Sequence, residues 1–227
     1  MRILMICDDY WHPGQTPSDG IAPLLEHGFD IDIIKDVSGF EFASLSEYQV
    51  VILCKSAGIP DKDITCWRTE DVQQAFITYV ENGGGLLVIH SGLVAGEKPG
   101  AFDQLIGSKF SFHPQECPVT VQAIKPHPVT NGVEMFCEVD EQYRLEILAD
   151  DIDIFLASYS PQQGDETQIN SEPYQNSNAW IGAAGYCRTQ GNGRVCVLTP
   201  GHHVQVWLNK QFQRLLQNAL NWCAVKS

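Results

Sequence analysis

Short, continuous apolar runs separated by polar segments dominate the first ninety residues of the chain. Residues 2–7, 49–56 and 85–90 are such runs, and residues 30–36 alternate apolar and polar positions. Continuous apolar runs are typical of strands that are buried on both faces of a parallel sheet. The pattern therefore predicts four strands over these segments.

Helical periodicity is clearest over residues 69–85, where Thr69 is a suitable N-cap and glycines follow the last apolar position. The apolar stripe of this predicted helix consists of Val72, Phe76, Ile77 and Val80. Because the helix lies between two predicted strands, a right-handed crossover and parallel pairing are expected. We also predict a short helix over residues 21–28, ending at Gly28, and a last helix over residues 204–223.

The second half of the chain is less regular. Strands are predicted over residues 119–124 and 153–159, a polar loop over residues 161–178, and a hairpin formed by residues 180–187 and 193–201. No internal repeat or linker separates these elements. The order predicts an α/β protein with one domain over residues 1–227, a three-layer sandwich of flavodoxin-like type with a mostly parallel central sheet.

The net charge of the chain argues against polyanionic partners. The 227 residues include 28 acidic and 14 basic side chains, for a formal net charge of -14. Proteins that bind nucleic acid or anionic membranes need a basic surface, so neither is an expected partner. No apolar stretch approaches the ~20 residues of a membrane span. No signal peptide is recognisable at the N-terminus, so the expected location is the cytoplasm.

The eight cysteines have no CxxC pair and no zinc-finger spacing. Cys7, Cys54 and Cys196 lie inside apolar runs, where a free thiol behaves as a small hydrophobic group. With no export signal, reduced structural thiols are the favoured interpretation.

The seven histidines are more informative. His12 follows the first predicted strand, His90 ends the fourth, and His202 follows the last. In open α/β sheets ligands bind at the carboxyl ends of the strands, so these three side chains should converge on one rim. A single loop histidine is more often a surface residue, which is the favoured interpretation for His27.

Two kinds of chemistry could use such a cluster. One is a divalent metal site, with zinc as the example and His90, His113 and His202 as candidate ligands. The other is general acid–base catalysis. The spacing does not decide between them, because no HExxH or HxH pattern is present. The acidic residues nearest to suitable positions are Asp8, Asp9, Asp140 and Glu141.

Several motifs, in order, resemble the ThuA-like, or trehalose utilisation, family. They are WHP (residues 11–13), GGGLLVIHSG (83–92), HPVTNGV (127–133), FCEVDEQY (136–143) and GNGRVCVLTPGHHVQVW (191–207). The resemblance implies a class I glutamine amidotransferase-like fold. Amidotransferases of this fold carry a nucleophilic cysteine at the elbow, the tight turn after a central strand. The resemblance implies that this nucleophile is lost here, because His90 and Ser91 occupy the elbow. His202 matches a retained strand-end histidine, whereas His203 stands where the family usually has an acid.

The resemblance further implies a role in carbohydrate catabolism, on disaccharides such as trehalose or their keto derivatives, with a divalent metal in some members. An enzyme catalysing hydrolysis, elimination or isomerisation is the first hypothesis. Its catalytic residues would be His90, His202 and Glu141. Its substrate-binding residues would be His12, Trp11, Ser91 and Tyr143. A sugar could stack on rim aromatics, for which exposed positions are expected at Tyr10, Trp11, Tyr143 and Trp207. For Trp207, packing at the start of the last helix is favoured at least as much.

A non-catalytic sugar-binding or interaction protein is the alternative hypothesis. A functional glutamine amidotransferase is the least favoured, since the elbow lacks cysteine. Ser91 is expected as a turn or cap residue rather than a nucleophile, because the GxSxG pattern is absent. The apolar and aromatic content is compatible with a homo-oligomer.

Overall fold

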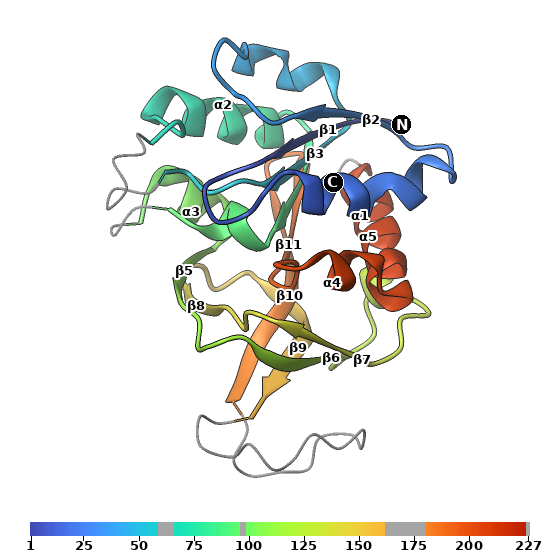
Figure 1. Ribbon diagram of the computed structural model, residues 1–227. Helices are drawn as coiled ribbons and strands as arrows, with labels where there is room; N and C mark the ends of the chain where they lie inside the picture. The colour runs from blue at the N-terminus through green and yellow to red at the C-terminus, as the bar shows by residue number, and fades with distance from the viewer. Residues whose placement is uncertain (59–65, 96–98, 162–179, 226–227) are drawn as a thin grey trace.

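A nine-stranded mixed sheet dominates the computed structural model, which describes residues 1–58, 66–95, 99–161 and 180–225 (Figure 1). Its strand order is β2-β1-β3-β4-β11-β10-β9-β6-β7. The pairings from β2 to β11 are parallel, and those from β11 to β7 are antiparallel. The protein is therefore an α/β protein, and the expectation of a mostly parallel sheet holds for one half only.

We call β2, β1, β3, β4 and β11 the parallel half. Its strands are β2 (Asp30–Ile34), β1 (Arg2–Cys7), β3 (Val50–Cys54), β4 (Gly85–Ile89) and β11 (Gly193–Leu198). Every residue of β3 and β4 is buried, which explains their unbroken apolar sequence. The predicted helical connection and parallel pairing are confirmed: helix α2 (Glu70–Glu81) connects β3 to β4, and Thr69 accepts the Val72 N–H at 3.5 Å.

We call the remaining strands the antiparallel half. They are β10 (Trp180–Gln190), β9 (Asp153–Ser160), β6 (Cys117–Ala123) and β7 (Phe136–Asp140). The predicted hairpin between β10 and β11 is confirmed. Strand β7 was not predicted, nor was the small sheet of β5 (Ser108–Phe112) and β8 (Arg144–Ile147). The predicted polar loop falls largely on residues 162–179, outside the described residues.

Helices cover both faces of the parallel half (Figure 1). Helices α1 (Gln15–Leu25), α4 (Val204–Leu208) and α5 (Lys210–Cys223) pack on one face. Helices α2 and α3 (Ala101–Ile106) pack on the other. Residues from alternate positions of β1 point to the two faces, Ile3 and Met5 to the first and Leu4 and Ile6 to the second.

Two predicted helices differ from the structure. Helix α1 begins at Gln15 rather than Ile21 and ends at Leu25 rather than Gly28, and Gly20 lies inside it, where the Trp207 ring packs. A Cβ at Gly20 would lie 2.3 Å from the Trp207 Cβ. The single helix expected over residues 204–223 is two helices, because the extended backbone of Asn209 separates them. The Asn209 side chain then caps α5 by accepting the Gln211 N–H at 2.9 Å.

All eight cysteines are free thiols, and five of them are buried. No helix within the described residues is long and apolar enough to cross a membrane.

Candidate metal and acid–base site

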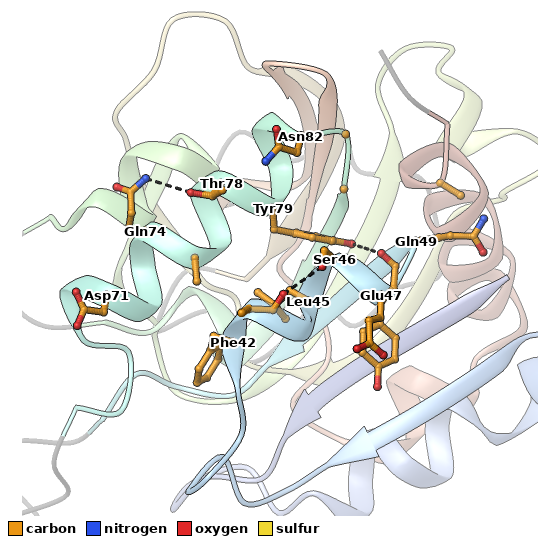
Figure 2. A pocket seen from close by; sticks show the side chains of 16 residues that line it. Phe42, Leu45, Ser46, Glu47, Gln49, Asp71, Gln74, Thr78, Tyr79 and Asn82 are labelled. Carbon is orange, nitrogen blue, oxygen red and sulfur yellow. Dashed lines mark hydrogen bonds between the residues drawn. The ribbon is translucent and has the colours of Figure 1, made fainter.

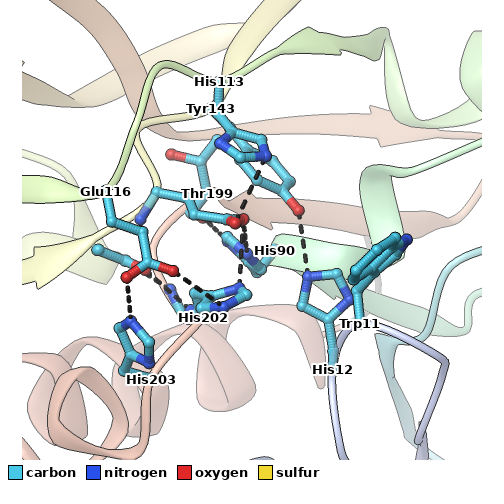
Figure 3. A network of polar contacts seen from close by, with 12 residues as sticks. Trp11, His12, His90, His113, Glu116, Tyr143, Thr199, His202 and His203 are labelled. Carbon is cyan, nitrogen blue, oxygen red and sulfur yellow. Dashed lines mark hydrogen bonds and ion pairs between the residues drawn. The ribbon is translucent and has the colours of Figure 1, made fainter.

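Three histidines meet at the carboxyl end of the parallel half (Figure 3). His12 follows β1, His90 follows β4 directly, and His202 lies in the turn after β11. Ring centroids are 5.1 Å apart for His12 and His90, 5.1 Å for His12 and His202, and 5.4 Å for His90 and His202. The three histidines that the sequence predicts at the ends of parallel strands therefore lie close together in the structure.

His90 is held in a fixed tautomer by its surroundings. It is buried, and its φ of 44° lies in the left-handed region that side chains other than glycine rarely adopt. Its Nδ1 lies 2.8 Å from the Thr199 carbonyl oxygen, which can only accept, so Nδ1 carries a proton. Its Nε2 faces Glu141 Oε2 at 3.2 Å. In the neutral ring, two lone pairs would therefore face each other, so a proton or a cation is needed between them.

Glu141 is the carboxylate common to the cluster, and it comes from the antiparallel half, one residue after β7. Its Oε2 also lies 3.2 Å from His202 Nδ1, and its Oε1 lies 3.4 Å from His113 Nε2. Burial acts to raise its pKa, but the neighbouring His202 and His90 rings lower the pKa of Glu141 well below its usual range. Glu141 is therefore ionised at neutral pH.

His202 has one nitrogen without a matched partner. Its Nδ1 is buried and has no hydrogen-bond partner of normal geometry among the residues that the structure describes, although Glu141 lies close by. The adjacent Glu141 carboxylate raises the pKa of His202. A buried nitrogen of this kind costs free energy unless a proton transfer or a ligand satisfies it.

Asp140 fixes His202 relative to Glu141. Its Oδ2 accepts the Gly201 N–H at 2.9 Å, and its Oδ1 accepts the N–H groups of His202 and Glu141 at 3.0 Å each. Burial raises the pKa of Asp140. The residue lies at the end of β7, so it connects the antiparallel half to the turn after β11.

His12 is oriented by Asp9 in the same loop. The His12 Nδ1–H donates to Asp9 Oδ1 at 2.7 Å, and Asp9 Oδ2 accepts the Ser56 N–H at 2.8 Å. Burial lowers the pKa of His12, so the neutral ring is favoured, with its Nε2 lone pair facing the cluster. A carboxylate behind a histidine is the usual support for a metal ligand. The three-residue spacing within one short loop is the sequence signal for this pair.

Four nitrogen and oxygen donors fit a divalent cation. His12, His90, Glu141 and His202 each offer one ligand atom, and these atoms all lie within 4.8 Å of one another. Imidazole and carboxylate ligands suit zinc and similar ions. The set differs from the expected ligands, because His12 belongs to it. His113 instead contacts the far oxygen of Glu141 and is more exposed.

The other predicted site residues occupy three kinds of position. Tyr143 is buried, stacks on His90 with centroids 3.9 Å apart, and places its hydroxyl 3.5 Å from His12 Nε2. Ser91 is also buried, beside His90 in η3 (His90–Leu93). Trp11 is 54% exposed at the edge of the cluster. The expected exposure is therefore wrong for Tyr143. Trp207 is buried in the core, so its alternative interpretation, packing at the start of the last helix, is the one confirmed.

A separate cavity lies at the opposite end of the sheet, near the amino ends of β3 and β4 (Figure 2). Its volume is about 560 Å³, and η1 (Phe42–Glu47) and α2 form its walls. Tyr79 lines it and donates a hydrogen bond to the Gly85 carbonyl at 3.0 Å. No histidine or cysteine among the described residues lines it. The group of His12, His90, Glu141 and His202, which we call the strand-end cluster, is therefore the better candidate for a catalytic or metal site.

The fold and the cluster together define an α/β protein with an imidazole–carboxylate site at the carboxyl ends of its parallel strands. The family model for ThuA, trehalose utilisation, matches residues 2–223. The chain belongs to this family. No curated protein sequence matches it significantly.

Solved structures show the same fold. A ThuA-like protein from Parabacteroides merdae has a TM-score of 0.72 and 21% identity, over 99% of this chain and 90% of that one. One from Bacteroides uniformis has a TM-score of 0.69 and 21% identity, over 98% and 91%. A β-galactosidase from Rahnella matches with a TM-score of 0.60 and 14% identity, over 96% of this chain but 31% of its own.

Proposed function

We propose that the protein is an enzyme of carbohydrate catabolism that acts on a disaccharide or keto-sugar with a divalent metal at the strand-end cluster. The observation behind this proposal is the convergence of His12, His90, Glu141 and His202 within 4.8 Å. The description of the family as one of trehalose utilisation supports the substrate class. We further propose that the protein acts in the cytoplasm.

His12, His90, Glu141 and His202 would hold the metal. A bound divalent cation would polarise a sugar carbonyl or lower the pKa of a water molecule. Asp9 and the Thr199 carbonyl hold the protons of His12 and His90 on Nδ1, which leaves each Nε2 directed at the cluster. Glu141 remains an anion that can stabilise positive charge in the site.

Substrate would bind on the open side of the cluster. His113 donates from Nδ1 to the Pro114 carbonyl at 2.9 Å, so its Nε2 is available to accept a proton near Glu141. Tyr143 can donate its hydroxyl proton toward His12 or a substrate oxygen. Trp11 presents an exposed ring suited to stacking on a pyranose face, next to Tyr10 at a centroid distance of 4.6 Å.

We also propose that the architecture is a three-layer sandwich of flavodoxin-like or amidotransferase-like type. The helices on both faces of the parallel half support it. The elbow after β4 contains His90 and Ser91 where an amidotransferase would need a cysteine. Glutamine hydrolysis is therefore not the proposed reaction.

Metal content and turnover of keto-sugars, compared between wild type and His90→Ala, test the proposal. We expect bound metal and turnover in the wild type and loss of both in His90→Ala. His27→Ala is the matched control, because His27 is exposed near the end of α1. Equal turnover by folded His90→Ala would exclude the central role of this histidine.

A non-catalytic sugar-binding role is the second candidate. It is favoured by the β-galactosidase match, in which this fold accounts for only 31% of a larger chain. This role predicts that a sugar raises the melting temperature of the protein without product formation. Product formation that depends on His90 would exclude it.

A further inference from the structure

A second group of metal-ligating side chains lies on the outer side of His202 (Figure 3). His203 Nε2 lies 3.0 Å from Glu116 Oε2, and His202 Nε2 lies 3.6 Å from Glu116 Oε1. Glu116 comes from the segment just before β6, so two separate parts of the chain contribute. Glu116, His202 and His203 each offer a ligand atom within 4.8 Å of the others.

The two nitrogens of His202 face two different groups of ligands. Nδ1 faces Glu141 at 3.2 Å and Nε2 faces Glu116 at 3.6 Å. The ring of His203 lies nearly perpendicular to that of His202, with centroids 4.6 Å apart. One imidazole therefore stands between the buried cluster and an outer, more accessible one.

We propose that Glu116, His202 and His203 form a second cation site, the outer site, for a borderline divalent ion such as Zn²⁺. It shares the His202 ring with the inner site, which is the group of His12, His90, Glu141 and His202 described above. Two imidazoles and one carboxylate are a ligand set that zinc accepts, with its remaining position open to water or a substrate oxygen. The outer ligands themselves do not depend on the proposed enzymatic function.

The outer site differs from the inner one in accessibility. The side chains of Glu116 and His203 are 43% and 36% exposed, whereas those of His90 and Glu141 are 2% and 11% exposed. An ion at the outer site can therefore exchange with solvent. The net charge of -14 favours the approach of a cation over that of an anion.

Sharing one imidazole makes the two sites interdependent. A substitution of the shared ring removes one ligand from each site. Loss of His202 should impair both sites, which neither Glu116 nor His90 variants should do.

Zinc titration of the metal-free full-length chain tests the outer site, by calorimetry and by metal analysis after gel filtration. We expect about two equivalents of zinc in the wild type and about one in Glu116→Gln and in His203→Asn. His90→Asn should lose the inner equivalent, and His202→Asn should weaken both. Glu26→Gln and His27→Asn are matched controls on the exposed end of α1, and both should keep two equivalents.

Each outcome decides between the sites. Two equivalents that persist in Glu116→Gln and His203→Asn overturn the outer site. One wild-type equivalent that His90→Asn and His202→Asn remove, and that Glu116→Gln and His203→Asn leave in place, also overturns it, while the inner site of the proposed function stands. One equivalent that Glu116→Gln, His203→Asn and His202→Asn remove, and that His90→Asn leaves in place, supports the outer site and overturns the inner one. No zinc at all overturns both. Because Glu116 and His203 are exposed, circular dichroism should show both variants folded.

Discussion

The parallel and antiparallel halves of the sheet contribute different chemistry to one site. The parallel half supplies imidazoles, because every one of its strands ends at the same edge and His12, His90 and His202 follow three of them. The antiparallel half supplies the carboxylate of Glu141 and the phenol of Tyr143, just beyond β7. The site therefore forms only where the halves meet, and neither half contains a complete set of ligands.

The turn that contains His202 shows how the halves are held together. Trp207, in helix α4 on a face of the parallel half, donates from Nε1 to the Gly201 carbonyl at 2.8 Å. Asp140, on the antiparallel half, accepts the N–H groups of Gly201 and His202. One anchor is mainly a packed aromatic ring and the other is a buried carboxylate, so their removal should have different consequences.

The largest effect on stability should follow removal of the packed anchor. Trp207→Ala leaves a cavity against Gly20 of α1 and an unpaired Gly201 carbonyl. We expect a loss of about 3–5 kcal/mol in the free energy of unfolding, measured by urea denaturation. Trp11→Ala is the control, and its exposed ring should cost less than about 0.5 kcal/mol. Similar losses in both variants would contradict the assignment of Trp207 to the core.

Zinc binding should require ligands from both halves. At a free zinc concentration 100 times Kd, binding should stabilise the wild type by about 2.7 kcal/mol, seen as a rise in melting temperature that a chelator reverses. His90→Asn removes an imidazole of the parallel half, and Glu141→Gln removes the carboxylate of the antiparallel half. Each should lose most of the shift due to the inner site. Full stabilisation of Glu141→Gln would show that the parallel half suffices.

Removal of the polar anchor should destabilise the protein less and disturb the site more. In Asp140→Asn one oxygen is replaced by an NH₂ group that cannot accept the Gly201 or His202 N–H. We expect a loss of about 1–3 kcal/mol in the free energy of unfolding, together with weaker zinc binding. Asp150→Asn, at an exposed position, should change neither. Unchanged zinc affinity in Asp140→Asn would mean that this residue stabilises the fold without positioning His202.

The difference between the halves also explains what the sequence could predict. Strands β1, β3 and β4 are buried on both faces, so their apolar runs are continuous and visible, and their ends locate His12 and His90. Strand β7 buries only its first and last residues, Phe136 and Asp140, so no apolar pattern marks it.

The grouping of Glu141 with the histidines depends on long-range pairing of β7, β6 and β9. Local sequence does not encode that pairing, although the family resemblance drew attention to the segment. Glu116 was missed for the same reason, since it precedes β6 and reaches His203 only in the assembled sheet. Residues at strand ends of a parallel sheet can be grouped by topology alone, whereas those contributed by antiparallel strands need the register.

The smallest effect concerns a histidine that links the antiparallel half to α5, away from the site. His127 stacks on Phe155 of β9 with ring centroids 4.4 Å apart, and its ring centroid lies 5.7 Å from that of Trp222 on α5. Its Nδ1 accepts the Val129 N–H at 3.1 Å, which caps η4 (Pro128–Thr130). Burial lowers the pKa of His127; the nearby Asp153 opposes this and Lys125 adds to it. The capping bond requires an unprotonated Nδ1.

The sign of the pH dependence follows from that lowered pKa. The unfolded chain takes up a proton at His127 near its ordinary pKa of about 6.5, before the folded protein does. Stability should therefore fall as the pH decreases from about 6.5 toward the folded pKa. In His127→Asn the side chain can still cap η4 but cannot ionise, so urea midpoints measured between pH 7 and pH 5.5 should decline less steeply than in the wild type. Equal slopes would show that protonation of His127 does not oppose folding, and that the contact between the antiparallel half and α5 is insensitive to its charge.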